Sequence, residues 1–194
     1  WDQRWSQVQD TDLSRGMARW FTGARLNVAY NCIDRHLPAR ADQVAIIWEG
    51  DAPGSDARIS YRELHERVCR LANVLKARGV KKGDRVCIYL PMIPEAACAM
   101  LACARIGLIH SVVYSGFSAP ALASRIQDAE SRAVITADVG YDRGKVIQLK
   151  SVVDEALANC GTVESVVVVR RQTPAIPLSS PKEIDWTDWL KGEK

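Results

Sequence analysis

The sequence has no long apolar run and no long block of basic residues. A helix that crosses a membrane needs about 18 or more consecutive apolar residues, and no window of the chain reaches that length. The N-terminus also lacks the basic, apolar and small-residue order of a signal peptide. The net charge of +3 comes from interspersed residues of both signs, which is not the pattern of a nucleic-acid-binding surface. These absences predict a cytoplasmic protein that binds neither a membrane nor nucleic acid.

The spacing of a disulfide framework or of a cysteine zinc site is missing as well. None of the cysteines forms a C-x-x-C pair, and most of them lie within apolar stretches. We therefore expect buried, reduced thiols, with no catalytic thiol and no metal site. The six cysteines are Cys32, Cys69, Cys87, Cys98, Cys103 and Cys160.

What the sequence does contain is enough apolar residues for a core, since 47% of its 194 residues are hydrophobic and 25% are charged. We divide it into an N-terminal arm (residues 1–40), an α/β unit (residues 41–170) and a Pro-containing connection with a truncated end (residues 171–194). The chain begins at Trp1 and closes without a strong core element, so we expect a fragment of a longer protein.

Apolar strand patterns alternate with helical patterns from residue 44 onward. The segments "VAIIWEG" and "ARISY" flank the turn-forming "DAPGSD" and predict a hairpin. Four later runs are typical of buried strands: 85–90, 108–113, 133–136 and 164–169. Because helical segments separate these runs, we expect a three-layer α/β fold, with a mainly parallel sheet and helices on both faces, preceded by the N-terminal arm.

Capping signals and periodicity indicate where the helices lie. Ser60 and Glu63 have the spacing of a capping box and predict a helix over 61–78. Pro94 opens the next helix, Ser118 caps a third, and "KVIQLKSVVDEALANC" is expected to be mostly helical. Apolar residues at steps of three and four predict the buried face of the first helix: Leu64, Val68, Leu71 and Leu75.

Ligands of such sheets bind beyond the carboxyl ends of the strands, where the loops "PMIPEA", "YSGFSAP" and "ADVGYDRGK" lie. The third loop spells G-x-x-x-G-K from Gly140 to Lys145, one residue short of a P-loop and without its Ser or Thr. Arg143 and Lys145 are expected near a helix start, where Gly144 lets a phosphate come close. A solvated loop is the more common explanation of such charges. Gly116, in the second loop, either admits a ligand or makes a turn.

Longer stretches carry a family resemblance. The segments "LNVAYNCIDRHL", "VAIIWEGD", "ISYRELHERVCRLANVLKARGVKKGDRVCIYLPMIPEAACAMLACARIG" and "HSVVYSGFS" resemble the N-terminal part of the AMP-forming acetyl-CoA synthetases, or acetate-CoA ligases. These belong to the larger family of acyl-CoA synthetases, luciferases and peptide-synthetase adenylation domains. The resemblance covers residues 17–157. It implies adenylation of a carboxylate with ATP and Mg²⁺, followed by transfer of the acyl group to CoA, with a C-terminal domain that rotates between the two steps.

The resemblance also implies a CoA-binding role for five positions. Residues that match Asp142, Arg143, Gly144 and Lys145 contact the nucleotide end of CoA in similar enzymes, where the cations meet the 3′-phosphate. The glycine that matches Gly116 lies beside the pantetheine tunnel.

Two positions depart from the family pattern. Asp142 replaces the first basic residue of the usual R-G-G-K or R-A-G-K, and an aspartate is expected to repel a phosphate. Ser115 replaces a glycine in the usual F-G-G-F-S, which adds a side chain beside the tunnel glycine.

The family's ATP phosphate loop, ribose-binding acid, acetate pocket, interdomain hinge and catalytic lysine all lie downstream of the matched segments. His36, His65 and His110 have no evident partner in the sequence, so we expect them to be structural and expect no catalytic residue in this chain. The resemblance therefore implies an N-terminal fragment of an acetate-CoA ligase, inactive alone, whose partners are acetate, ATP, CoA and the missing C-terminal portion. A free-standing, non-catalytic α/β module that binds a nucleotide or a partner is the alternative.

Overall fold

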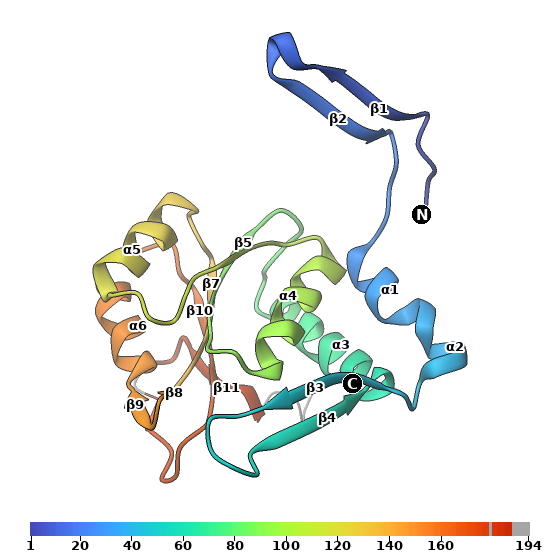
Figure 1. Cartoon of the computed structure of the whole chain (residues 1–194). Helices are drawn as coiled ribbons and strands as arrows, with labels where there is room; N and C mark the ends of the chain where they lie inside the picture. Colours follow the sequence, from blue (N-terminus) through green and yellow to red (C-terminus); the bar gives the residue numbers. More distant parts are fainter. Residues whose placement is uncertain (179, 188–194) are drawn as a thin grey trace.

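A five-stranded parallel sheet forms the centre of the computed structural model, which describes residues 1–178 and 180–187 (Figure 1). The strands are hydrogen-bonded in the order β11–β10–β7–β5–β6, and every pair is parallel. Nearly every side chain of the three middle strands is buried, as their continuous apolar sequences require. The strands are β5 (Arg85–Tyr89), β6 (Ile109–Val112), β7 (Ala133–Ala137), β10 (Ser165–Val169) and β11 (Glu183–Asp185).

Helices cover both faces of this sheet. On one face α3 (Tyr61–Ala77) packs against α4 (Pro94–Ile106), and on the other α5 (Ala119–Asp128) packs against α6 (Leu149–Leu157). Figure 1 shows the two pairs on opposite sides of the strands. The three-layer α/β fold with one parallel sheet is therefore confirmed.

The predicted capping box of α3 is present. The Ser60 hydroxyl oxygen accepts a hydrogen bond from the Glu63 backbone N–H at 3.3 Å, and the Glu63 carboxylate accepts one from the Ser60 backbone N–H at 2.8 Å. Ser118 also precedes a helix, but its side chain makes no capping hydrogen bond, so that prediction was wrong in its mechanism. The expected apolar face of α3 is buried: Leu64, Val68, Leu71 and Leu75.

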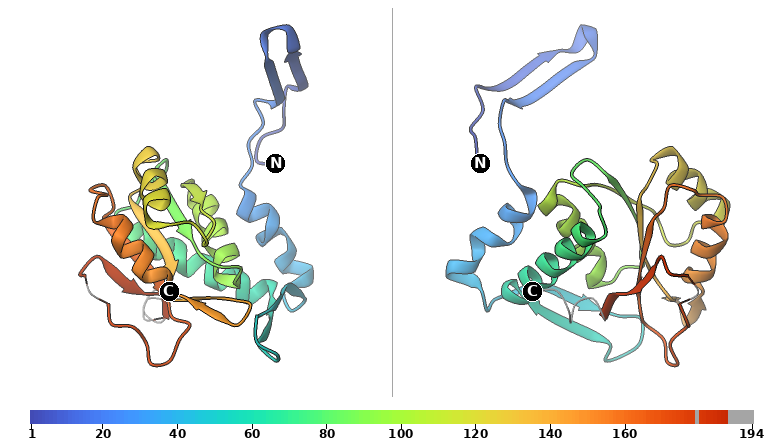
Figure 2. Two further views of the ribbon diagram at one scale, coloured as in Figure 1. Left: turned by 60° about the vertical axis from the view of Figure 1, so that its left-hand side comes forward. Right: turned by 180° about the vertical axis from the view of Figure 1, so that it is seen from behind.

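Two antiparallel hairpins precede the sheet in the sequence. The predicted hairpin consists of β3 (Val44–Glu49) and β4 (Asp56–Ser60), and it is confirmed. Near the N-terminus, β1 (Gln7–Asp12) and β2 (Met17–Thr22) are joined through the short 3₁₀ helix η1 (Leu13–Arg15). Figures 1 and 2 show from three directions that this β1–β2 hairpin stands away from the body of the molecule.

Short helices connect the β1–β2 hairpin to the body. They are α1 (Val28–Cys32), the 3₁₀ helix η2 (Asp34–His36) and α2 (Leu37–Arg40), and α1 packs against α4. Among the described residues, no helix has the length and apolarity needed to cross a bilayer.

The Pro-containing segment after residue 170 was expected to be an exposed connection, but it contributes β11 to the edge of the sheet. Ile184 is buried, and Glu183 forms an ion pair with Lys150 of α6, whose ammonium group also binds Asp154. The ammonium–carboxylate distances are 2.8 Å to Glu183 and 2.6 Å to Asp154. Burial alone would lower the pKa of Lys150, but the hydrogen bonds from these carboxylates raise it on balance. The charged group therefore fixes β11 to α6.

All six cysteines are free thiols, and four of them are buried, as expected. Burial raises the pKa of Cys87, Cys98 and Cys103 to about 12, so these thiols stay protonated and unreactive at neutral pH. Two cysteines depart from the prediction, since Cys32 is exposed and Cys69 is only partly buried.

His65, expected to lack a partner, joins an ion pair that ties η2 to α3 and α4. The Arg105 guanidinium donates to both carboxylate oxygens of Asp34, at 2.7 and 2.6 Å. The His65 Nε2 atom lies 3.1 Å from Arg105 Nη2 and 3.4 Å from Asp34 Oδ1. The hydrogen bonds from Arg105 outweigh burial and hold the pKa of Asp34 below its ordinary 3.8.

Replacing Asp34 should therefore destabilise the fold in a pH-dependent way. Because the folded pKa is lowered, the carboxylate stabilises the folded state above pH 3.8 and loses this effect as the pH falls below that value. We expect Asp34→Asn to lower the free energy of unfolding by about 1.5 to 3 kcal/mol near pH 7, as for hydrogen bonds to charged groups. In urea denaturation at a series of pH values, the difference in free energy of unfolding between wild type and Asp34→Asn should decrease as the pH falls through 3.8. A difference that does not change with pH would contradict the stabilising role of the Asp34 carboxylate. Asp42→Asn, which removes an exposed partner of Arg62, is the matched control and should change little.

Candidate functional site

The loop after β7 folds as a small hairpin rather than running directly into a helix. Its strands are β8 (Gly140–Asp142) and β9 (Lys145–Ile147), joined by Arg143 and Gly144. The φ angles of these two residues are 49° and 76°, as a two-residue hairpin turn of the primed type requires.

The prediction that Arg143 and Lys145 lie near a helix start was therefore wrong, because both belong to the hairpin. Residues 145–160 were expected to be mostly helical, and the helix within them, α6, runs from Leu149 to Leu157. The physical reason is that a turn with two positive φ angles reverses the chain and pairs β8 with β9 before a helix can form.

The hairpin presents its charged side chains to solvent. Asp142, Arg143 and Lys145 are exposed, and no ion pair joins them to any described residue. Asp142 and Lys145 are direct cross-strand partners, so their side chains project from the same face of the hairpin. The structure thus places Asp142 where it opposes the charge of Lys145, while Arg143 stands at the tip.

Contacts on both sides hold the hairpin in place. The Gly144 backbone N–H donates to the Asp51 carboxylate at 3.2 Å, which ties the tip to the turn between β3 and β4. The Tyr141 hydroxyl donates to the Arg171 carbonyl oxygen at 3.4 Å. The Arg171 guanidinium carbon lies 4.9 Å from the centre of the Tyr141 ring. The exposed cations therefore stand on a supported element.

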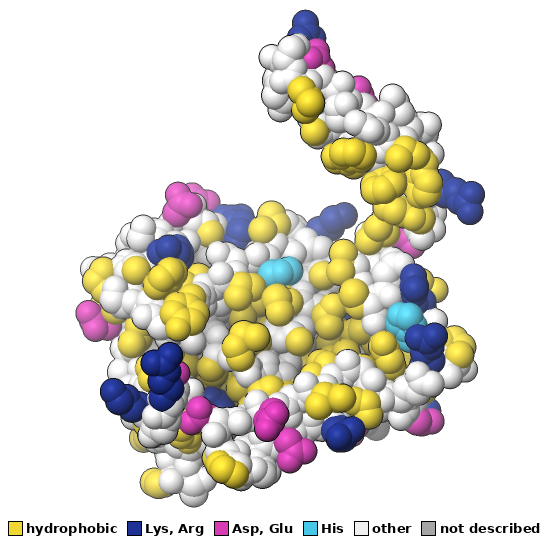
Figure 3. All heavy atoms as spheres, viewed as in Figure 1, with side chains coloured by type: hydrophobic (Ala, Val, Ile, Leu, Met, Phe, Trp, Pro, Cys, Tyr) yellow, Lys and Arg dark blue, Asp and Glu magenta, His cyan; other side chains and the backbone are white. Residues whose placement is uncertain are grey.

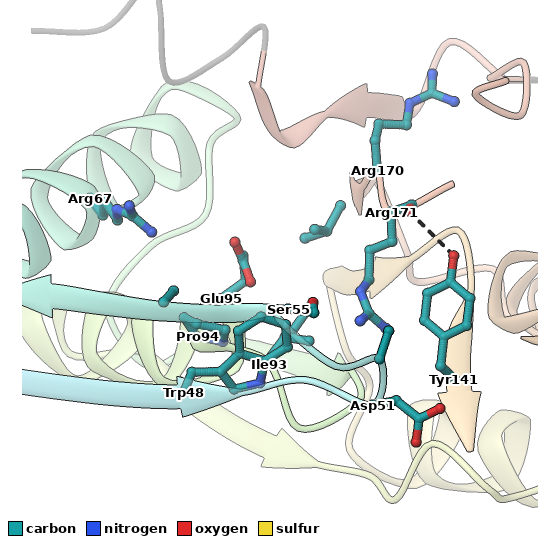
Figure 4. Close-up of a pocket in the computed structure, with 13 residues that line it drawn as sticks. Trp48, Asp51, Ser55, Arg67, Ile93, Pro94, Glu95, Tyr141, Arg170 and Arg171 are labelled. Carbon is teal, nitrogen blue, oxygen red and sulfur yellow. Dashed lines mark hydrogen bonds between the residues drawn. The ribbon is translucent and has the colours of Figure 1, made fainter. Parts of the chain in front are cut away.

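A cleft of about 500 Å³ lies between the β3–β4 hairpin, the start of α4 and the ends of β8 and β10 (Figure 4). Its charged lining residues include Arg67, Glu95 and Arg171. Trp48 of β3 also lines the cleft. Its indole N–H donates a hydrogen bond to the Met92 carbonyl oxygen at 2.7 Å, which fixes the β3–β4 hairpin to the loop after β5. The cleft thus combines an aromatic wall with charges of both signs.

The buried carboxylate of Asp138 organises the strand ends beside this cleft. It accepts hydrogen bonds from the backbone N–H groups of Val139 at 2.7 Å, Arg171 at 2.8 Å and Gln172 at 3.3 Å. These bonds join the end of β7 to the end of β10 and set the position of Arg171. Sequence reasoning missed Asp138, although an acid directly after a buried strand was a usable signal.

Gly116 lies in the loop after β6, apart from the β8–β9 hairpin. A Cβ atom at Gly116 would collide with Cε1 of Tyr114, so the exposed Tyr114 ring occupies the space that a side chain would need. No hydrogen bond or ion pair between described residues links Gly116 to the hairpin. The structure therefore places Asp142, Arg143, Gly144 and Lys145 on one hairpin and leaves Gly116 on a separate loop.

Of the three candidate ligand loops, the first and third line the cleft and the second does not. Asp51 was missed because its segment was interpreted only as a turn, and Arg171 because it falls in the connection after β10. Within residues 1–178 and 180–187, no group of three His, Cys, Asp or Glu side chains is placed to hold a metal ion.

Comparison with known proteins gives matches over almost the whole chain. A family model described as AMP-binding enzyme matches residues 33–191, and one described as acetyl-coenzyme A synthetase N-terminus matches residues 1–32. A relative named acetyl-coenzyme A synthetase 2, from Pseudomonas putida, is 66% identical over 88% of this chain and 27% of its own length. One of the same name from Pseudomonas aeruginosa is 60% identical over 95% of this chain and 28% of its own length.

A solved structure is similar as well. The acetoacetyl-CoA synthetase from Streptomyces lividans superposes with a TM-score of 0.86 and 29% sequence identity, over 98% of this chain and 29% of that one. The chain thus spans less than a third of the length of these curated and structural relatives.

The backbone at the hairpin tip generates a prediction about stability. A left-handed conformation costs about 1 to 2 kcal/mol for most L-residues, whereas Asn adopts it more readily and a β-branched residue resists it. We therefore expect Arg143→Asn to leave stability unchanged or slightly higher, and Arg143→Val to lower it by about 1 kcal/mol. Urea denaturation, with amide exchange of residues 141–147, measures the effect. Equal stability of the Arg143→Asn and Arg143→Val variants would contradict the left-handed conformation of Arg143 in this turn.

Proposed function

Since the chain belongs to the family of AMP-binding enzymes, we propose that it is the N-terminal part of an AMP-forming acetate-CoA ligase. The whole protein would convert ATP, acetate and CoA to acetyl-CoA, AMP and diphosphate. The names of the relatives and the match of residues 1–32 to an acetyl-coenzyme A synthetase N-terminus support this proposal.

The contribution of this chain is one wall of the CoA site. The observation that carries this proposal is the anchored β8–β9 hairpin, on which Arg143 and Lys145 are exposed cations without an ion-pair partner among the described residues. A phosphomonoester gains charge-assisted hydrogen bonds from such groups, and it carries more negative charge than a diester. We assign these two cations to the 3′-phosphate of CoA.

The other proposed CoA-binding residues shape this wall. Gly144 adds no side chain between the cations, and its N–H is already held by Asp51. Asp142 lies opposite Lys145 and offsets part of its charge, which would moderate the affinity for CoA. Gly116 would leave room for the pantetheine arm on condition that the Tyr114 ring moves aside, since that ring fills the adjacent space.

ATP, Mg²⁺ and acetate would be held by the downstream part of the protein. The described residues supply no cluster for a metal ion, and we assign no catalytic residue to this chain. We therefore expect the chain alone to be inactive and its principal partner to be the C-terminal portion of the same protein. A cytoplasmic location remains part of the proposal, because free cysteines are typical of a reducing compartment.

The Lys145→Ala variant of the full-length protein tests this function. Wild type should catalyse acetate-dependent exchange of pyrophosphate into ATP and, with CoA, form acetyl-CoA. Loss of the charge-assisted bond should raise the KM for CoA about 10- to 100-fold, equivalent to roughly 1.5 to 3 kcal/mol. The exchange reaction, measured without CoA, should stay near the wild-type rate.

Two controls separate the phosphate contact from general damage. Dephospho-CoA lacks the 3′-phosphate, so Lys145→Ala should affect its KM little. Lys81→Ala removes an exposed lysine before β5, at the amino end of the parallel strands, whereas β8 and β9 follow the carboxyl end of β7, and it should affect neither form of CoA. If Lys145→Ala raised the KM for CoA and for dephospho-CoA equally, the assignment of Lys145 to the 3′-phosphate would be wrong. If wild type showed no acetate-dependent exchange of pyrophosphate into ATP, the proposed ligase activity would be wrong.

A further inference from the structure

The β8–β9 hairpin is too short to fix its own orientation. Each strand has three residues, and two-stranded hairpins are at best marginally stable in water. At its base, Ile147 packs against the core, and Gly140 is so close to α6 that a Cβ atom there would lie 3.3 Å from Leu149 Cδ1. At its tip, a single hydrogen bond to the β3–β4 turn contributes modestly. A third contact, between Tyr141 and Arg171, is therefore needed to set the direction of the hairpin.

Arg171 contacts the Tyr141 side chain in two ways. Its guanidinium carbon lies 4.9 Å from the centre of the Tyr141 ring, and its backbone carbonyl oxygen accepts a hydrogen bond from the Tyr141 hydroxyl at 3.4 Å (Figure 4). The guanidinium also donates to the Val139 carbonyl oxygen at 3.3 Å, directly before the hairpin begins. A planar guanidinium stacks on an aromatic ring as no lysine ammonium can. Arg171 thus holds both the ring and the hydroxyl of Tyr141.

The core fixes Arg171 in turn through Asp138. The fully buried Asp138 carboxylate accepts a hydrogen bond from the Arg171 backbone N–H at 2.8 Å. The Asp138 backbone is held on both sides, since its N–H donates to the Val169 carbonyl oxygen at 2.9 Å and its carbonyl oxygen accepts from the Lys150 N–H at 3.1 Å. A continuous series of contacts therefore joins the central sheet to the hairpin, through Asp138, Arg171 and Tyr141.

Arg171 and Lys145 lie on opposite faces of the hairpin. Tyr141 pairs with Val146, and the next cross-strand pair is Asp142 with Lys145. Because side chains alternate along a strand, Tyr141 and Lys145 project to opposite sides. Figure 3 shows basic side chains at the surface around β8 and β9. Arg171 therefore supports the face behind Lys145, which is the place for a residue that orients this cation and not for one that shares its ligand.

We propose that Arg171, held by Asp138, is a positioning residue for CoA. It orients the β8–β9 hairpin so that Arg143 and Lys145 meet the 3′-phosphate, and it thereby sets how strongly the site prefers CoA to dephospho-CoA. Cations that already stand in the bound geometry lose less conformational freedom when the phosphate arrives. The inference rests on the proposed function, because it adds a residue to the same CoA site.

The Arg171→Met variant of the full-length protein tests this role. Methionine keeps an unbranched apolar side chain but removes the guanidinium. We expect the KM for CoA to rise about 5- to 10-fold, because the two cations lose their fixed orientation, and the KM for dephospho-CoA to change little. Acetate-dependent exchange of pyrophosphate into ATP, measured without CoA, should stay near the wild-type rate. An unchanged ratio of the two KM values would overturn the positioning role.

Arg170→Met is the matched control, since it makes the same substitution one residue earlier. The Arg170 Nε–H donates to the Asp185 carboxylate at 2.6 Å, and Figure 4 shows the Arg170 side chain directed away from Tyr141. This variant should lower the thermal midpoint, because β11 loses an ion pair, but it should leave the ratio of the two KM values unchanged. If Arg170→Met altered that ratio as much as Arg171→Met, general damage would explain the effect and the proposal would be wrong.

A second background separates positioning from direct binding. When Arg143 and Lys145 are both replaced by alanine, the hairpin has no cation left to orient. Adding Arg171→Met should then change the KM for CoA by less than about twofold, since residues that act through one another are not additive. A further rise as large as that in the otherwise wild-type protein would mean that Arg171 binds CoA itself, and would overturn the proposal.

Amide hydrogen exchange gives a measurement that does not depend on catalysis. In Arg171→Met, the amides of residues 140–147 should exchange about tenfold faster than in wild type, while those of β7 keep their wild-type rates. Unchanged exchange in the hairpin would contradict its support by Arg171.

The failure of this inference can be told apart from the failure of the proposed function. If Lys145→Ala did not distinguish CoA from dephospho-CoA, the phosphate contact would be wrong, and the role of Arg171 in CoA binding with it. If Lys145→Ala did distinguish them and Arg171→Met left the ratio of KM values unchanged, only the positioning role would be wrong.

Discussion

The structure depends on the constraint that parallel strands must be joined by crossovers. Each crossover returns the chain to the end of the sheet at which every strand begins. The loops after β5, β7 and β10 therefore lie together at the opposite end, beyond the carboxyl ends of the strands. The buried Asp138 carboxylate links two of these loops through backbone N–H groups, and Trp48 links the β3–β4 hairpin to the third. The cleft and the β8–β9 hairpin both result from this convergence.

The main elements could be predicted because their signals are local. Buried strands have continuous apolar sequences, and α3 has both a capping box and a regular apolar face. The β8–β9 hairpin was missed because its turn begins with Arg143, a residue that rarely adopts a positive φ, so the usual Asn-Gly or Asp-Gly signal is absent. β11 was missed because its three residues join the sheet through distant partners, including the ion pair between Glu183 and Lys150.

The candidate site shows the same division between local and distant information. The resemblance to acetyl-CoA synthetases singled out the segment from Asp142 to Lys145, but only the hairpin register reveals that these two residues oppose each other. The Asp51 carboxylate, which accepts the hydrogen bond from the Gly144 N–H, belongs to a turn more than ninety residues earlier. No spacing in the sequence predicts this contact. The geometry therefore changes the expected role of Asp142, from a group that simply repels phosphate to one that also moderates the charge of Lys145.

The most direct measurement of the central claim is a crystal structure of the full-length protein with CoA bound. Our account predicts that the 3′-phosphate lies within hydrogen-bond distance, about 2.7 to 3.2 Å, of Lys145 Nζ, with the Arg143 guanidinium turned toward the same phosphate. A CoA molecule whose 3′-phosphate is held only by residues outside 140–147 would contradict it.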